Sequence, residues 1–239
     1  MPISEAPSSS FDAVQEKAGL SEHEGVVMRL LELAAPTVEG ATVLAKRLRT
    51  LEGVVLHSLL KMPPMVQRNR RYFAMLDSLA AGGEGVEIPG LTATDRAELR
   101  EALDGDMYKK AAVVLLALND TLMEDTSTWL TVTWKTLQIE HVLPQTLDGD
   151  SEWTLHFRPK EREAWTNKLG NLTLMTGKLN ASLGNKPFKV KRADMTKAIF
   201  PLTREAFEHP EWTPEVVAKQ HKRLLWLANK RWGPGLNEP

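Results

Sequence analysis

The 239-residue chain contains no cysteine, so it forms no disulfide bond and offers no thiolate ligand for zinc. It also lacks a run of about 18 apolar residues and an apolar signal segment near its N-terminus. We therefore expect a cytoplasmic protein without a membrane partner. Its net charge of −1 excludes a chain that is basic throughout, so any surface that binds nucleic acid must be local.

Hydrophobic residues make up 42% of the chain, which is enough for a substantial core. In the first half, apolar residues recur at helical spacing, and prolines or glycines follow all but the last of these runs. Thr92 and Asp95 form a plausible capping box in front of the fourth run. The pattern predicts helices at 24–35, 37–60, 65–79, 94–103 and 107–123.

Two short apolar segments later in the chain, 137–143 and 172–175, are typical of strands. Helices are expected again at about 177–183 and 188–200, and from Thr213-Pro214 to about Trp232. The predicted fold class is α+β and mainly α-helical. We divide the chain into a disordered tail at 1–20, a helical N-terminal region at 21–125, a core at 126–200 and a C-terminal helical closure at 201–239.

Isolated charged residues in the N-terminal region have ordinary interpretations. Arg68, Arg70 and Arg71 lie within one helical turn, and a solvated helix face is favoured over a phosphate contact. His23 and His57 are single histidines on helical patterns and are interpreted as structural or exposed. The first 125 residues therefore supply no catalytic motif.

The segment 139–192 carries the chemically informative residues. Glu140 and His141 lie near the end of the first strand, before Pro144. Asn171 begins the second strand, and Asn180 follows nine residues later in a predicted helix. Because neighbouring residues on a regular strand face opposite sides, Glu140 and His141 can serve one point only at a strand end or a bulge.

These residue types suit phosphodiester hydrolysis by a single metal ion. A hard divalent cation binds carboxylate and amide oxygens, which Glu140 and Asn180 offer. The cation neutralises charge on the phosphate, and a histidine such as His141 deprotonates water. The set Glu140, His141 and Asn180 therefore predicts a nuclease site.

The motifs IEHVLPQ, LGNLTLM and LNASLGNKPFKVKR resemble the C-terminal HNH (ββα-metal) nuclease domain of GmrSD-type, modification-dependent restriction endonucleases. The resemblance implies that His141 is the general base and that Glu140 and Asn180 bind Mg²⁺ or Mn²⁺. It implies that Asn171 holds the loop after the first strand and orients His141. Asn185 would be a further ligand, a phosphate contact or a helix cap, and Gln145 would contact the loop backbone or the substrate.

A basic cluster beside these motifs supports contact with DNA. A solvated helix face usually mixes charges of both signs more evenly than this segment does. Contact with phosphate would position the DNA backbone without reading its sequence. The predicted DNA-binding residues are Lys178, Lys186, Lys189, Lys191 and Arg192.

The resemblance implies a metal-dependent endonuclease or nickase for double-stranded DNA that acts in antiviral defence. Relatives join this domain to a nucleotide-hydrolysing recognition domain or subunit, which is absent from this chain. One such site cuts one strand, so a double-strand break needs a homodimer or two events. Three alternatives remain open: a catalytically decayed HNH-fold DNA-binding or assembly module, a helical scaffold in which these residues are structural, and RNA instead of DNA as the substrate.

Overall fold

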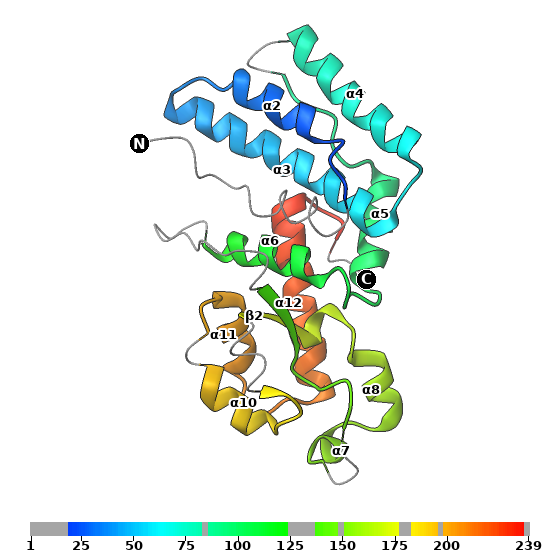
Figure 1. Ribbon diagram of the computed structural model, residues 1–239, viewed down its shortest axis with the longest axis vertical. Helices are drawn as coiled ribbons and strands as arrows, with labels where there is room; N and C mark the ends of the chain where they lie inside the picture. Colours follow the sequence, from blue (N-terminus) through cyan, green and yellow to red (C-terminus); the bar gives the residue numbers. More distant parts are fainter. Residues whose placement is uncertain are drawn as a thin grey trace. The chain divides into compact units, whose positions relative to one another are not determined.

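The computed structural model describes residues 19–82, 86–123, 137–147, 151–176, 183–195 and 198–236. Residues 1–18 of the tail predicted at 1–20, and residues 177–182 of the helix predicted at about 177–183, lie outside these residues. The chain divides into two compact units, drawn in Figure 1. The first holds residues 1–100 and 232–235, and the second holds 101–231 and 236–239. The functional division at residue 125 stays a prediction.

Unit 1 is built from helices where the periodicity predicts them. They are α2 (Glu24–Glu32), α3 (Val38–Lys61), α4 (Met65–Gly82) and most of α5 (Ala93–Leu103). The Thr37 hydroxyl caps α3 by accepting the N–H of Gly40 at 3.0 Å. The predicted capping box of α5 is confirmed, since Thr92 and Asp95 each bond the other's backbone N–H.

Unit 2 surrounds a two-stranded antiparallel sheet with helices (Figure 1). Strand β1 (Leu137–His141) pairs with β2 (Leu172–Thr176) in a register that runs from Leu137↔Thr176 to His141↔Leu172. Helix α6 (Ala111–Met123) packs against both strands, and α11 (Pro201–Phe207) packs against β2. The remaining elements are α7 (Trp153–His156), α8 (Pro159–Trp165), η3 (Leu169–Asn171), α10 (Phe188–Met195) and α12 (Pro214–Trp232).

The mainly helical fold with a small antiparallel sheet is confirmed over the described residues. Two details differ from the prediction. The helix expected at 188–200 is shorter, since α10 ends at Met195, and Pro201 begins a separate helix, α11, where its missing N–H costs nothing. The polar composition of 147–159 predicts a loop, but this segment contains α7. Its Trp153 is buried in the core of unit 2 with Phe157 and Trp212.

Candidate active site

His141 lies at the end of β1, with 8% of its surface exposed. Its Nε2 atom lies 3.1 Å from Oδ1 of Asn167. The Tyr108 ring packs against the imidazole with 4.6 Å between the ring centroids. Burial lowers the pKa of His141, and the nearby Lys191 charge adds to this effect, while Asn167 and Asp106 oppose it. The imidazole is therefore neutral, and so able to accept a proton, at neutral pH.

The Asn171 side chain hydrogen-bonds the backbone of the segment that follows β1. Its Oδ1 accepts the N–H of Leu143 at 2.8 Å and the indole N–H of Trp212 at 3.0 Å. Its Nδ2 donates to the carbonyl oxygens of Leu143 at 3.0 Å and Thr166 at 2.9 Å. The side chain is fully buried and uses both donors and its acceptor oxygen. These bonds fix the backbone two residues beyond His141, as the resemblance implies for this asparagine.

The variant Asn171→Ala should lower the free energy of unfolding by about 2–4 kcal/mol, because it leaves several buried polar groups without partners. Urea unfolding followed by tryptophan fluorescence measures the loss. The matched control is Asn185→Ala, since Asn185 is exposed in the turn after Leu183. Equal stability of the two variants would contradict this role for Asn171.

Glu140 and Lys191 form a buried ion pair on the opposite side of β1. The Nζ atom of Lys191 lies 2.5 Å from Oε1 of Glu140 and donates to the carbonyl oxygens of His141 at 2.9 Å and Val142 at 3.1 Å. It also lies 5.9 Å from the centre of the Trp153 ring. Lys191 has no exposed surface, and Glu140 is 6% exposed. Burial raises the pKa of Glu140 and lowers that of Lys191, and each charge opposes the shift of the other.

This pairing does not fit two of the predicted roles. Lys191 cannot contact DNA, because it is buried and its three N–H groups already have acceptors. Glu140 does not fit a metal ligand, because a divalent cation at its carboxylate would lie beside a buried ammonium group. The strand explains the separation, since the regular register through Glu140↔Thr173 and His141↔Leu172 directs neighbouring side chains to opposite faces.

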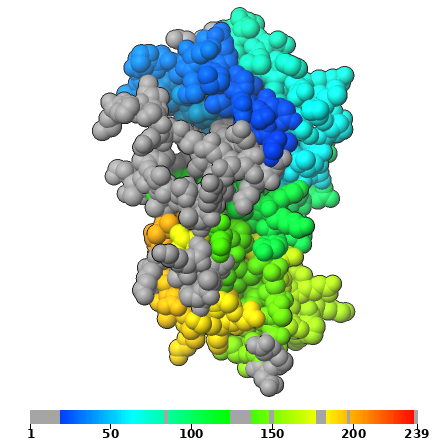
Figure 2. Space-filling model, in the orientation of Figure 1, coloured from blue at the N-terminus to red at the C-terminus, as the bar shows by residue number. Residues whose placement is uncertain are grey.

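The other predicted site residues are placed as follows. Gln145 and Asn185 are exposed. Lys186, Lys189 and Arg192 are exposed on and beside α10. The surface of this helix is drawn in yellow in Figure 2. Asn180 and Lys178 lie outside the described residues, so the second predicted metal ligand is not placed. The structure thus brings together His141 and Asn171, and it gives Glu140 a different partner.

The sequence analysis missed Asn167 and Asp106. Nδ2 of Asn167 donates to Oδ2 of Asp106 at 2.8 Å, and Oδ1 of Asn167 faces His141. Asp106 belongs to the loop between α5 and α6, sixty-one residues before Asn167. The only local signal is an aspartate turn, in which Oδ1 of Asp106 accepts the N–H of Tyr108 at 3.1 Å.

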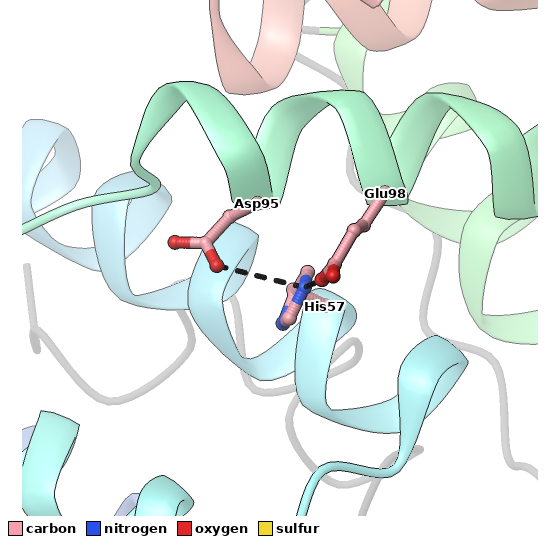
Figure 3. Close-up of side chains that lie close together, drawn as sticks. All are labelled: His57, Asp95 and Glu98. Atoms are coloured by element: carbon pink, nitrogen blue, oxygen red, sulfur yellow. Dashed lines mark hydrogen bonds and ion pairs between the residues drawn. The ribbon is translucent and has the colours of Figure 1, made fainter.

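One group of three potential metal ligands is present among the described residues, and it lies in unit 1 (Figure 3). Nε2 of His57 on α3 lies 2.7 Å from Oε2 of Glu98 and 3.7 Å from Oδ1 of Asp95, both on α5. Their ligand atoms all lie within 4.8 Å of one another, close enough to hold one cation.

The contacts of Arg71 indicate that His57, Asp95 and Glu98 form a structural ion network instead of a metal site. Its guanidinium pairs with Asp95, and its Nη1 lies 3.1 Å from Nδ1 of His57. Arginine only donates, so Nδ1 accepts and the ring proton lies on Nε2, facing the carboxylates. A metal at Nε2 would require the opposite tautomer. Arg71 therefore joins α4 to α3 and α5, which is neither a solvated face nor a phosphate contact.

Unit 2 is an α+β domain. The buried His141 lies at the end of its first strand, and Asn171 hydrogen-bonds the backbone of the segment that follows. The family model of the GmrSD restriction endonucleases, C-terminal domain, matches residues 94–227, which is more than half of the chain. The chain belongs to this family, and it contains the nuclease domain of a GmrSD-type restriction endonuclease. Neither the curated proteins nor the solved structures that were compared include a match.

Proposed function

We propose that this chain is an endonuclease or nickase that hydrolyses double-stranded DNA in an antiviral restriction system, with His141 as the general base. The main support for this proposal is the His141 imidazole at the end of β1. It is buried and neutral, and its Nε2 atom is held by Asn167. A base must be unprotonated at working pH and fixed within reach of a water molecule. His141 meets the first condition through burial and the second through Asn167 and Tyr108.

Asn171 is proposed to act as a positioning residue in this reaction. It contacts the backbone that follows His141 rather than the substrate, so it would keep the base in place. Trp212, in the segment before α12, shares Oδ1 of Asn171 and so ties this loop to the C-terminal part of unit 2. The proposal predicts that its substitution reduces activity through stability and geometry together.

The proposed cleavage requires Mg²⁺ or Mn²⁺, and the plasmid assay is carried out with and without the metal ion. The described residues around His141 contain no complete ligand set, because Glu140 is neutralised by Lys191. Asn180 remains a proposed ligand.

The exposed cations of α10 are the proposed contact with the DNA backbone. Lys189 and Arg192 line a surface hollow of about 570 Å³ between α10 and α11, together with Arg204. Arg192 and Arg204 donate to backbone carbonyl groups at Phe207 and Ala198, which fixes their guanidinium groups at the rim. The surface of α10, drawn in yellow in Figure 2, is part of this proposed contact with DNA.

The variant Lys189→Ala should weaken DNA binding without changing stability, because the side chain is exposed. Loss of one phosphate contact should reduce the slope of log K against log[salt] by about 0.9. Fluorescence anisotropy with a labelled duplex at several salt concentrations measures it. Lys160→Ala, at an exposed lysine on α8, is the matched control and should leave the slope unchanged. A Lys189→Ala slope equal to that of the wild type would contradict the contact.

The proposed function is tested by incubating supercoiled plasmid with the full chain and Mg²⁺ or Mn²⁺, against an EDTA control. Metal-dependent appearance of open circles supports a nickase, and linear product supports double-strand cleavage by a dimer. If the chain alone does not cut, the assay is repeated with a nucleotide-hydrolysing recognition partner. Absence of cleavage in both assays would overturn the proposal.

The buried Glu140–Lys191 pair favours one alternative, a DNA-binding or assembly module whose metal site has decayed. This alternative predicts normal binding to duplex DNA without cleavage under any metal condition. The plasmid assay and the anisotropy measurement together separate the two functions.

A further inference from the structure

We propose that Asn167 and Asp106 are positioning residues that hold the imidazole of His141 with its proton on Nε2 and leave Nδ1 as the atom that accepts a proton from water. The inference rests on the proposed function for its chemistry. The hydrogen-bond directions on which it depends are present in the structure itself, so its test does not require cleavage.

The direction of the chain of hydrogen bonds is fixed at Asp106. An ionised carboxylate only accepts, so the group of Asn167 that lies 2.8 Å from Oδ2 of Asp106 must be the NH₂ group. The carbonyl oxygen of the Asn167 amide therefore faces Nε2 of His141 at 3.1 Å. An amide oxygen only accepts, so Nε2 must carry the ring proton. In the neutral imidazole, Nδ1 is then unprotonated.

Backbone contacts hold the two loops that carry these residues together. The N–H of Met107 donates to the carbonyl oxygen of Asn167 at 2.9 Å. Nearby, Oδ1 of Asp104 accepts from Nζ of Lys168 at 3.1 Å and from Nε2 of His221 at 3.0 Å. The relative position of Asp106 and Asn167 is therefore set by several bonds besides their own.

Tyr108 limits the remaining freedom of the imidazole. Its ring lies across the His141 ring at an interplanar angle of 54°. The N–H of Tyr108 is itself bonded to Asp106, so the same loop supplies the ring that packs on His141 and the carboxylate that orients Asn167. The contact with Asn167 uses Nε2 of His141, and no hydrogen bond to its Nδ1 is found among the described residues.

In hydrolysis, the oxygen of the attacking water forms a bond to phosphorus while Nδ1 takes one of its protons. The bond between phosphorus and the leaving oxygen breaks, and solvent water protonates the released alkoxide. The imidazolium keeps its Nε2–H bond to Asn167 and returns the extra proton to solvent. The products are a phosphate monoester and a hydroxyl group.

The test is the tautomer of His141, measured from ¹⁵N chemical shifts of the full chain labelled at histidine. His141→Gln assigns its signals. The expected result is a pyrrole-type Nε2 and a pyridine-type Nδ1. His221 serves as an internal reference, because its Nδ1 accepts the N–H of Gly170 and its Nε2 faces Asp104. A wild-type His141 with its proton on Nδ1 would overturn the proposal.

Two variants separate orientation from simple packing. In Asp106→Asn the amide of Asn167 can reverse, so the Nδ1–H tautomer of His141 should become populated while the His221 signals stay unchanged. The exchange variant Asp106→Asn/Asn167→Asp keeps an acceptor at Nε2 and an amide donor between the two side chains, so it should retain the wild-type tautomer. If the chain cleaves DNA, Asp106→Asn should lower kcat several-fold with KM unchanged.

An unchanged His141 tautomer in Asp106→Asn would also overturn the assignment. If the tautomer responds as expected and no variant or wild type cleaves DNA, the positioning stands and the proposed function fails.

Discussion

The variant His141→Ala is expected to lose DNA cleavage by a factor of about 10²–10⁴, because a positioned general base contributes that much to hydrolysis. Initial rates of plasmid nicking by wild type and variant measure the effect. DNA binding should be retained, since the cations of α10 are untouched. Cleavage at the wild-type rate would refute the assignment of the base.

The control for this variant is His156→Ala, at an exposed histidine in α7. His156 shares with His141 only its residue type, so its removal should leave the cleavage rate unchanged. Circular dichroism of both variants checks that the fold persists. A similar loss in the two variants would point to general damage rather than to loss of the base.

The pH dependence of cleavage should follow the same imidazole. Burial places the pKa of His141 below its ordinary value of 6.5, so the neutral base predominates above pH 6.5. Activity should fall as the pH drops through the lower folded-state pKa and the ring becomes protonated. A profile of kcat/KM against pH whose acid limb has its midpoint above pH 6.5 would contradict this assignment.

The variant Lys191→Met should lower the free energy of unfolding by about 3–5 kcal/mol, the usual cost of leaving a buried charge unpaired. Glu140 would lose its partner, and the carbonyl groups of His141 and Val142 would each lose a donor. Urea unfolding measures the effect. Lys189→Ala, two residues earlier on the exposed face of α10, should change stability by less than about 0.5 kcal/mol.

The double variant Glu140→Gln/Lys191→Met distinguishes an ion pair from simple packing. Removing both charges should restore part of the stability that Lys191→Met loses, since no carboxylate then needs a partner. Additive losses in the double variant would show that the two charges are not coupled. Such additivity would reopen the predicted metal-binding role of Glu140.

The parts of the fold that the sequence predicts are those set by local patterns. Helix periodicity located α3 and α6, and the pair Thr92 and Asp95 identified the capping box of α5. Asn171 was identified from its motif, and it bonds the backbone of Leu143 after β1, while its role in a reaction stays a prediction. These features depend on neighbours within a few residues or on a motif.

The remaining features depend on residues that are far apart in the sequence. Lys191 is a surface cation by composition, and only the packing of α10 brings it to Glu140, fifty-one residues away. Asp106 and Asn167 carry no shared motif, and their contact exists because two loops meet. The sequence analysis allowed a shared role for Glu140 and His141 at a strand end or a bulge, but the register of β1 is regular through both residues.

Gly170 gives the site a dependence on the order of synthesis. A side chain at this position would meet Cβ of His221 at 2.6 Å and the carbonyl oxygen of Val217 at 2.7 Å, so η3 rests directly on α12. His221 in turn bonds Gly170 and Asp104. A nascent chain that has not yet released α12 from the ribosome therefore lacks the surface on which both loops close. We therefore expect the loops that carry Asp104 and Gly170 to close only after the helix at 214–232 has been synthesised.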